Sequence, residues 1–193
     1  MKKHTLVYAI PLASLATIIL CSLEGSAIAQ TPAQIAQSPA LQCLGSSGDA
    51  AISVCTEAIK QNSGNYRLYN ARGKAWSEKQ EYDKAIADFG EAIRTDPKQV
   101  VPYFLRGQAW SEKREWDKAI ADYNESIRLC PIIAGDSSQN VAVAGIYNRR
   151  GTAWLNKRDY DKAISDYNEA ILLDPKSEAA KRNLQRALEA KRK

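Results

Sequence analysis

The sequence has little of what catalytic and metal-binding sites usually require. It contains a single histidine, His4, among 193 residues, and its four cysteines form no Cys-x-x-Cys pair. Histidine is the usual general base near neutral pH and the commonest metal ligand in proteins. The chain also has no glycine-rich phosphate loop and no nucleophile placed beside a base. We therefore expect no enzyme, no metal or other cofactor, and no small-molecule substrate.

An excess of one charge is also missing. Lys and Arg number 27 against 22 Asp and Glu, which gives a formal net charge of +5. No block of basic residues with interleaved aromatic residues is present, so we do not expect nucleic acid as a partner. Hydrophobic residues make up 45% of the chain and charged residues 25%, which is typical of a globular domain.

The N-terminus has the pattern of a secretory signal peptide over residues 1–29. Two lysines are followed by an uncharged stretch at residues 6–23 and by Ala27-Ile28-Ala29, a small-residue cleavage site. We expect cleavage after Ala29, with an uncleaved anchor as the alternative and the one route to membrane contact. Lipidation of Cys21 is disfavoured because bulky residues precede it.

Export sets the expected compartment, which is the periplasm if the source is Gram-negative and the extracellular space otherwise. Cleavage leaves three cysteines, Cys43, Cys55 and Cys130. Exported proteins meet an oxidising environment, so these cysteines can form a disulfide.

A segment of the sequence occurs three times. Residues 75–94 recur at 109–128 and at 153–172, and the first two copies agree at 15 of 20 positions. Gly73 and Gly107 are 34 residues apart, whereas Gly107 and Gly151 are 44 apart, which is one period plus a ten-residue insertion. A fixed period of this length is typical of proteins built from stacked repeats.

Each unit has the pattern of two helices. Apolar residues recur at steps of three and four, as in Ala85, Ile86 and Phe89. We expect an aspartate to cap the second helix of each unit and a proline to follow it. These residues are Asp83, Asp117 and Asp161, with Pro97, Pro131 and Pro175.

Small and large residues complete the pattern. Glycines and alanines recur at fixed places, and each unit has an aromatic pair 13 residues apart, one member per helix. The pairs are Trp76 with Phe89, Trp110 with Tyr123, and Trp154 with Tyr167. The period, the Gly-x-x-aromatic step, the alanines and the final proline resemble the tetratricopeptide repeat (TPR), although Trp stands where Tyr is more usual.

The resemblance implies an all-α fold, a right-handed superhelical solenoid of antiparallel helix pairs. We place full repeats at 66–99, 100–133 and 144–177. A flexible lead-in at 30–37, a degenerate repeat at 38–65, an insertion at 134–143 and a capping helix at 178–193 account for the rest of the mature chain.

The insertion and the capping helix carry local signals. The insertion is either a loop or, as we favour, the start of a lengthened helix capped by Ser138. In the capping helix we expect Ala180, Leu184 and Leu188 to form the buried stripe, with a membrane-surface helix as the alternative.

Aligning the degenerate repeat with the others places Cys55 at the position of Phe89. Cys43 lies 12 residues before it, close to the spacing of the aromatic pairs. We expect Cys43 and Cys55 to form a disulfide in place of that aromatic contact, with two buried thiols as the alternative. Cys130 then remains unpaired, either as a small packed residue or as an exposed thiol.

The resemblance also implies a concave face lined by the first helix of each unit. Its expected binding residues are Arg67, Asn70, Lys74, Val101, Phe104, Leu105, Gln108, Asn148, Arg149 and Thr152. Their mixture of apolar, amide and basic side chains suits a peptide with an apolar anchor and a carboxylate. We expect a non-catalytic scaffold that binds a segment of another protein. The alternatives are a self-associating scaffold without a peptide ligand and a face that is merely solvated.

Overall fold

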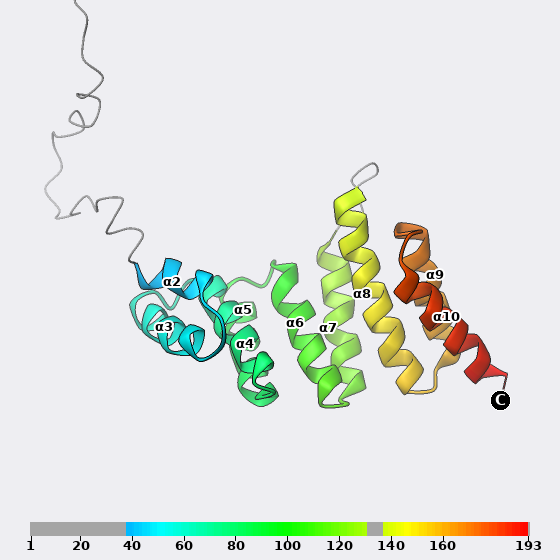
Figure 1. Ribbon diagram of the computed structural model, residues 1–193, viewed down its shortest axis with the longest axis horizontal. Coiled ribbons are helices and arrows are strands. Elements are labelled where there is room, and N and C mark those ends of the chain that lie inside the picture. Colours follow the sequence, from blue (N-terminus) through cyan, green and yellow to red (C-terminus); the bar gives the residue numbers. More distant parts are fainter. Residues whose placement is uncertain (1–37, 131–136, 193) are drawn as a thin grey trace, which may run out of the picture.

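The computed structural model describes residues 38–130 and 137–192, so the expected signal peptide and lead-in lie outside the described residues. Within those ranges every element is a helix, and the helices follow one another in a single row along the long axis of the molecule (Figure 1). They are α2 (Pro39–Gly45), α3 (Gly48–Gln61), α4 (Tyr66–Glu78), α5 (Tyr82–Thr95), α6 (Val100–Glu112), α7 (Trp116–Leu129), α8 (Ser137–Asn156), α9 (Tyr160–Leu173) and α10 (Glu178–Lys191).

The helices pack as consecutive pairs. α4 packs against α5, α6 against α7, and α8 against α9, and each second helix also contacts the first helix of the next unit. The predicted all-α solenoid is therefore confirmed. Of the helices in the described ranges, none has both the length and the apolar character needed to cross a bilayer.

The repeated glycines allow the two helices of each unit to approach closely. A Cβ atom built on Gly73 would lie 2.6 Å from Cε1 of Phe89, which is almost fully buried. The same holds for Gly107 beside Tyr123 at 2.8 Å and Gly151 beside Tyr167 at 2.9 Å. Carbon atoms pack best at about 3.5–4.0 Å, so any side chain at these positions would overlap the ring.

The expected helix caps need correction. α5 begins at Tyr82 with Glu81 as its N-cap residue, so Asp83 lies inside the first turn, and Asp117 and Asp161 lie likewise inside α7 and α9. Each aspartate instead forms an ion pair with a lysine of the following unit. These pairs, here called the inter-repeat ladder, are Asp49–Lys79, Asp83–Lys113, Asp117–Lys157 and Asp161–Lys191.

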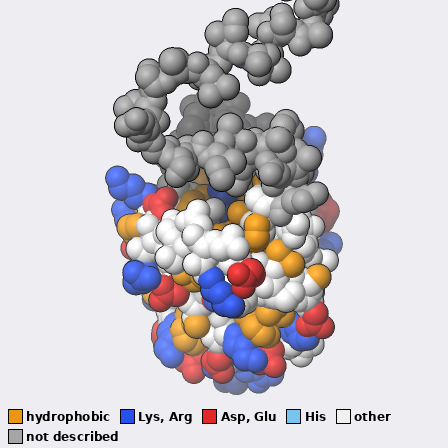
Figure 2. Space-filling view, turned by 90° about the vertical axis from the view of Figure 1, so that its left-hand side faces the viewer, with side chains coloured by type: hydrophobic (Ala, Val, Ile, Leu, Met, Phe, Trp, Pro, Cys, Tyr) orange, Lys and Arg blue, Asp and Glu red, His pale blue; other side chains and the backbone are white. Residues whose placement is uncertain are grey.

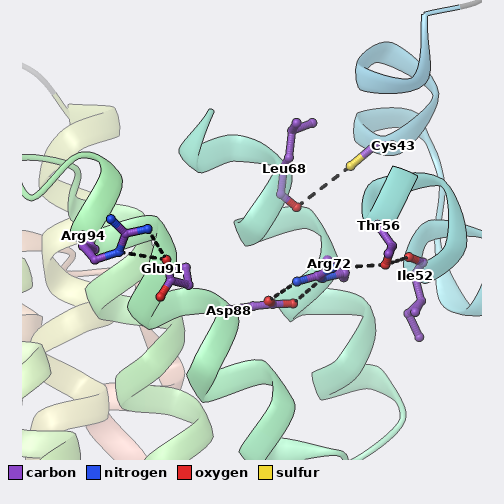
Figure 3. A network of polar contacts seen from close by, with 8 residues as sticks. All are labelled: Cys43, Ile52, Thr56, Leu68, Arg72, Asp88, Glu91 and Arg94. Atoms are coloured by element: carbon purple, nitrogen blue, oxygen red, sulfur yellow. Dashed lines mark hydrogen bonds and ion pairs between the residues drawn. The ribbon is translucent and has the colours of Figure 1, made fainter. Parts of the chain in front are cut away.

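A second set of ion pairs joins the two helices within each unit. Arg72 donates to both carboxylate oxygens of Asp88, from Nε at 2.8 Å and from Nη2 at 2.7 Å, and also donates to Thr56 of the preceding unit at 3.1 Å (Figure 3). The hydrogen bond to Asp88 raises the pKa of Arg72. The equivalent two-bond pairs are Arg106–Asp122 and Arg150–Asp166. Because each aspartate is almost buried, these pairs fix how the two helices lie against each other.

The first, degenerate unit is closed by a disulfide between Cys43 and Cys55. Both sulfurs belong to a buried cluster with Leu68 of α4, whose carbonyl oxygen lies 4.0 Å from Sγ of Cys43 (Figure 3). The short helix α2 is thereby attached to the solenoid covalently. Cys130, at the end of α7, is a free and half-buried thiol.

The insertion lengthens a helix, as favoured from the sequence. α8 begins at Ser137 and has 20 residues, compared with 13 in α4 and α6. Ser138 therefore lies in the first turn of the helix, and residues 131–136 lie outside the described residues. At the other end, α10 buries Ala180 and Ala187 fully, whereas Leu184 and Leu188, predicted in the buried stripe, are only half-buried.

Candidate functional site

The first helices and the turns that follow them line four pockets, named here A to D in chain order. Pocket A, about 230 Å³, lies where α4 meets the α2–α3 turn. Pocket B, about 350 Å³, lies between α4 and α6, and pocket C, about 570 Å³, lies between α6 and α8. Pocket D, also about 570 Å³, lies where the α8–α9 turn meets α10.

Shared lining residues connect the pockets into one groove. Lys74 and Glu78 line both A and B. Gln108, Glu112 and Arg149 line both B and C. Asn156 lines both C and D. The groove therefore runs from the disulfide-closed unit to the capping helix, long enough to contact every unit of the solenoid.

Half of the binding residues expected from the sequence line these pockets. They are Lys74, Leu105, Gln108, Arg149 and Thr152. The other five are not among the lining residues. They are Arg67, Asn70, Val101, Phe104 and Asn148.

Two of these five form contacts with residues of other helices. Phe104 is half-buried and packs against the ring of Tyr123, with the two ring centroids 6.1 Å apart. Asn148 accepts a hydrogen bond from Asn183 of α10 at 2.9 Å. Phe104 thus serves mainly the core, and Asn148 helps to attach the capping helix.

The remaining three differ in exposure. Val101 is 54% exposed, and Arg67 is exposed with its Nε donating to the Tyr66 hydroxyl at 3.4 Å. Asn70 is only 8% exposed, and its Oδ1 has no hydrogen-bond partner among the described residues.

Sequence reasoning missed the contribution of the turns and second helices. Tyr82, Trp116 and Tyr160 occupy the first position of α5, α7 and α9, and they line pockets B, C and D respectively. Arg114 and Arg158, two residues before the last two of these aromatics, line C and D. The sequence signal that could have identified these residues is the aromatic residue that recurs at this position of each unit.

The groove collects cations that have no ion-pair partner. Most Lys and Arg of the described ranges belong to the inter-repeat ladder, to the pairs within units, or to pairs three residues apart on one helix. In contrast, five cations that line pockets B to D form no ion pair within those ranges, namely Lys74, Arg114, Arg149, Arg158 and Arg186. The carboxylates in the same lining are Glu78, Glu112 and Glu189.

The end face of the solenoid has a different charge distribution. Figure 2 shows the N-terminal end, where blue and red side chains alternate with apolar ones over the visible part of the surface. Neither sign of charge gathers there. Of the cations that form no ion pair among the described residues, five line the groove, whereas others such as Lys98 and Arg182 lie outside it.

Tyr123 is one of the residues that line pocket C. Burial raises the pKa of the Tyr123 hydroxyl, which bonds to Ser111 Oγ at 3.2 Å, so this hydroxyl is protonated at neutral pH. Among the described residues, no three His, Cys, Asp or Glu side chains gather as a metal site would require.

Models of the tetratricopeptide repeat match residues 45–100, 81–131 and 144–177, which together make up more than half of the chain. The chain is a TPR protein. No curated protein matches it. The matched residues include most of the lining of pockets A to C, whereas pocket D is also lined by Arg186, Glu189 and Ala190 of α10, outside the matched ranges.

Solved TPR structures share this fold at low sequence identity. MamA protein is 21% identical, with a TM-score of 0.68, over 81% of this chain and 80% of that one. The first TPR of Spaghetti (RPAP3), bound to the HSP90 peptide SRMEEVD, is 22% identical, with a TM-score of 0.59, over 68% of this chain and 97% of that one. The Arabidopsis OM64 TPR domain is 22% identical, with a TM-score of 0.56, over 64% of this chain and 94% of that one.

Proposed function

We propose that this protein is an exported, non-catalytic TPR scaffold that holds a peptide segment of a partner protein in the groove. The observation that carries the proposal is the continuity of pockets A to D along the solenoid, with unpaired cations beside apolar side chains. A ligand in such a groove gains hydrogen bonds and ion pairs without breaking any that the protein already makes.

The structural neighbours support a peptide as the ligand. The first TPR of Spaghetti binds an HSP90 peptide, and the second TPR domain of human RPAP3 is seen in complex with the HSP70 peptide SGPTIEEVD. Because TPR proteins are generally interaction modules, a binding role fits this chain better than catalysis. The identity of its own partner follows from neither structure.

The proposed place of action is outside the cytoplasm. The signal-like N-terminus supports export, and the Cys43–Cys55 disulfide is the kind of bond that an oxidising compartment sustains. In a Gram-negative source the compartment would be the periplasm, and the partner a component of an envelope complex. N-terminal sequencing of the protein from its native compartment tests this, with Gln30 as the expected first residue.

The binding role is tested with the mature protein as bait. Partners cross-linked in the intact compartment are identified by mass spectrometry, and direct binding of a purified candidate is then measured. Leu105→Glu changes the lining of pocket B, and Arg149→Glu changes a residue shared by pockets B and C; each should weaken binding at least about tenfold. Lys98→Glu changes an unpaired exposed cation outside the pockets and should leave the affinity unchanged.

The self-associating scaffold remains the competing function. In the described structure, α10 covers the last unit and its Lys191 occupies the last place in the inter-repeat ladder, which favours a closed end. Light scattering of the mature protein decides between the two. A monomer supports the peptide-binding scaffold, whereas a concentration-dependent polymer with unaltered partner binding in Arg149→Glu would reject it.

A further inference from the structure

Pockets C and D each contain two arginines from different elements. Pocket C has Arg114 from the α6–α7 turn and Arg149 from α8. Pocket D has Arg158 from the α8–α9 turn and Arg186 from α10. All four are exposed, and none forms an ion pair with any described residue. Each pocket therefore combines one turn arginine with one arginine of a helix, although Arg149 and Arg186 occupy different positions in the repeat.

The backbone at the turn arginines gives a second observation. Arg114 and Arg158 have φ values of +60° and +62°, in the left-handed region that residues with a Cβ atom disfavour. Glycine is the residue that this turn conformation favours. Neither arginine side chain has a hydrogen-bond partner among the described residues, so interactions within the described protein do not account for arginine at these turns.

Gln80 provides an internal comparison. It occupies the same position in the α4–α5 turn, also with positive φ, but it lines none of the four pockets. The residue at this turn position is thus an arginine where it lines pocket C or D, whereas Gln80 does not itself line a pocket, although its neighbours Glu78 and Tyr82 line pocket B.

The other lining residues define the ligand further. Each pocket contains one carboxylate, Glu112 in C and Glu189 in D, and that of Glu189 already accepts a hydrogen bond from Gln185 at 2.9 Å. Two arginines against one carboxylate leave each pocket cationic. A guanidinium group can bind a carboxylate through two parallel hydrogen bonds.

We infer that pockets C and D are paired anion sites for side-chain carboxylates of an internal acidic stretch in the partner polypeptide. This inference rests on the proposed function and names the chemistry of the ligand. Because the two pockets meet at Asn156, a segment that fills both carries acidic residues along its length. A single carboxylate at a chain terminus would fill only one of them.

The test uses a twelve-residue oligoglutamate peptide, acetylated and amidated at its ends, with the mature protein in low salt. Binding is followed by fluorescence anisotropy, and an oligoglutamine peptide of the same length should not bind. Each of Arg114→Gln, Arg149→Gln, Arg158→Gln and Arg186→Gln should weaken binding about two- to fivefold, as expected for an exposed ion pair. Arg182→Gln removes an unpaired, exposed arginine of α10 that lines no pocket, and it should change nothing.

Several outcomes would overturn the inference. An equal loss in Arg182→Gln would mean unspecific charge attraction. Binding that requires a free C-terminal carboxylate would mean a terminal site. Tighter binding of a twelve-residue single-stranded DNA would mean a nucleic-acid ligand. If the envelope partner is lost in Leu105→Glu but retained in all four arginine variants, the proposed function stands and this inference fails.

Discussion

Two glycines, Gly73 in α4 and Gly90 in α5, allow one substitution to be tested at two sites with opposite expected effects. At Gly73 a new Cβ would lie 2.6 Å and 2.9 Å from two ring carbons of Phe89, whose side chain is 1% exposed. At Gly90 the nearest atom is Nη1 of Arg106 at 3.8 Å, which is an ordinary contact.

The magnitudes follow from two opposing terms. Replacing a glycine inside a helix by alanine favours the helix by about 1 kcal/mol. Overpacking a filled core costs about 1–3 kcal/mol, and an overlap of this size belongs at the upper end. We therefore expect Gly73→Ala to lower the free energy of unfolding by about 2 kcal/mol, and Gly90→Ala to raise it by about 1 kcal/mol.

Urea unfolding followed by circular dichroism measures both variants against the parent protein. The difference between them, about 3 kcal/mol, is large for a single domain. A Gly73→Ala protein as stable as the parent would refute the close approach of α4 and α5 described above. A destabilised Gly90→Ala protein would refute the open surroundings of that residue.

Three further predictions concern the disulfide, the buried tyrosines and the turns. Replacing Cys43 and Cys55 together by alanine should lower stability by about 3 kcal/mol by the loop-entropy model and remove hydrogen-exchange protection from α2 before the other helices. Burial raises the pKa of Tyr123, so the folded state holds its proton more tightly than the unfolded state. The stability that this protonated hydroxyl contributes is complete below about pH 10 and is lost as the pH rises through the folded pKa. Tyr123→Phe should therefore reduce the loss of stability at alkaline pH, as measured by urea unfolding at a series of pH values. Gln80→Gly and Arg114→Gly should each raise the free energy of unfolding by about 0.5–1 kcal/mol, because each replaces a residue with a positive φ by glycine. Only Arg114→Gly should also weaken oligoglutamate binding. Equal binding by the two variants would contradict the role of the turn arginine.

Much of the fold could be predicted from the period alone. A 34-residue spacing of Gly, Trp and Ala defines two helices per unit, and the observed contacts of Gly73 with Phe89 are the kind that such small and large residues make. This works because core contacts depend on residue size and spacing, which are visible in the sequence.

The polar contacts could not be predicted in the same way. Arg72 and Asp88 are 16 residues apart, and each looks like an ordinary solvent-facing residue until the two helices are placed together. Aspartate often caps helices, and Asp83 precedes an apolar helical pattern in the sequence. The turn at Gln80 nevertheless lets α5 begin at Tyr82, so the carboxylate of Asp83 forms an ion pair with Lys113 of the next unit instead.

The groove was only partly predictable for a related reason. Leu105 and Arg149 lie where the family pattern implies, whereas Asn148 is engaged by Asn183 because α10 packs over α8. Equivalent positions of different repeats are therefore not equally free to bind a ligand, because the last repeat also contacts α10. Family patterns describe a typical inner unit and do not include its particular neighbours.

The inter-repeat ladder has a consequence for how such a chain can change in length. Its lysine follows its aspartate by 30 residues at three places and by 40 at the fourth, where the insertion intervenes, yet the same pair of side chains meets each time. Each junction is thus chemically interchangeable with the next. Duplicating or excising one hairpin would join faces that already fit, so the reach of this protein can evolve, or be engineered, in whole units without designing a new interface.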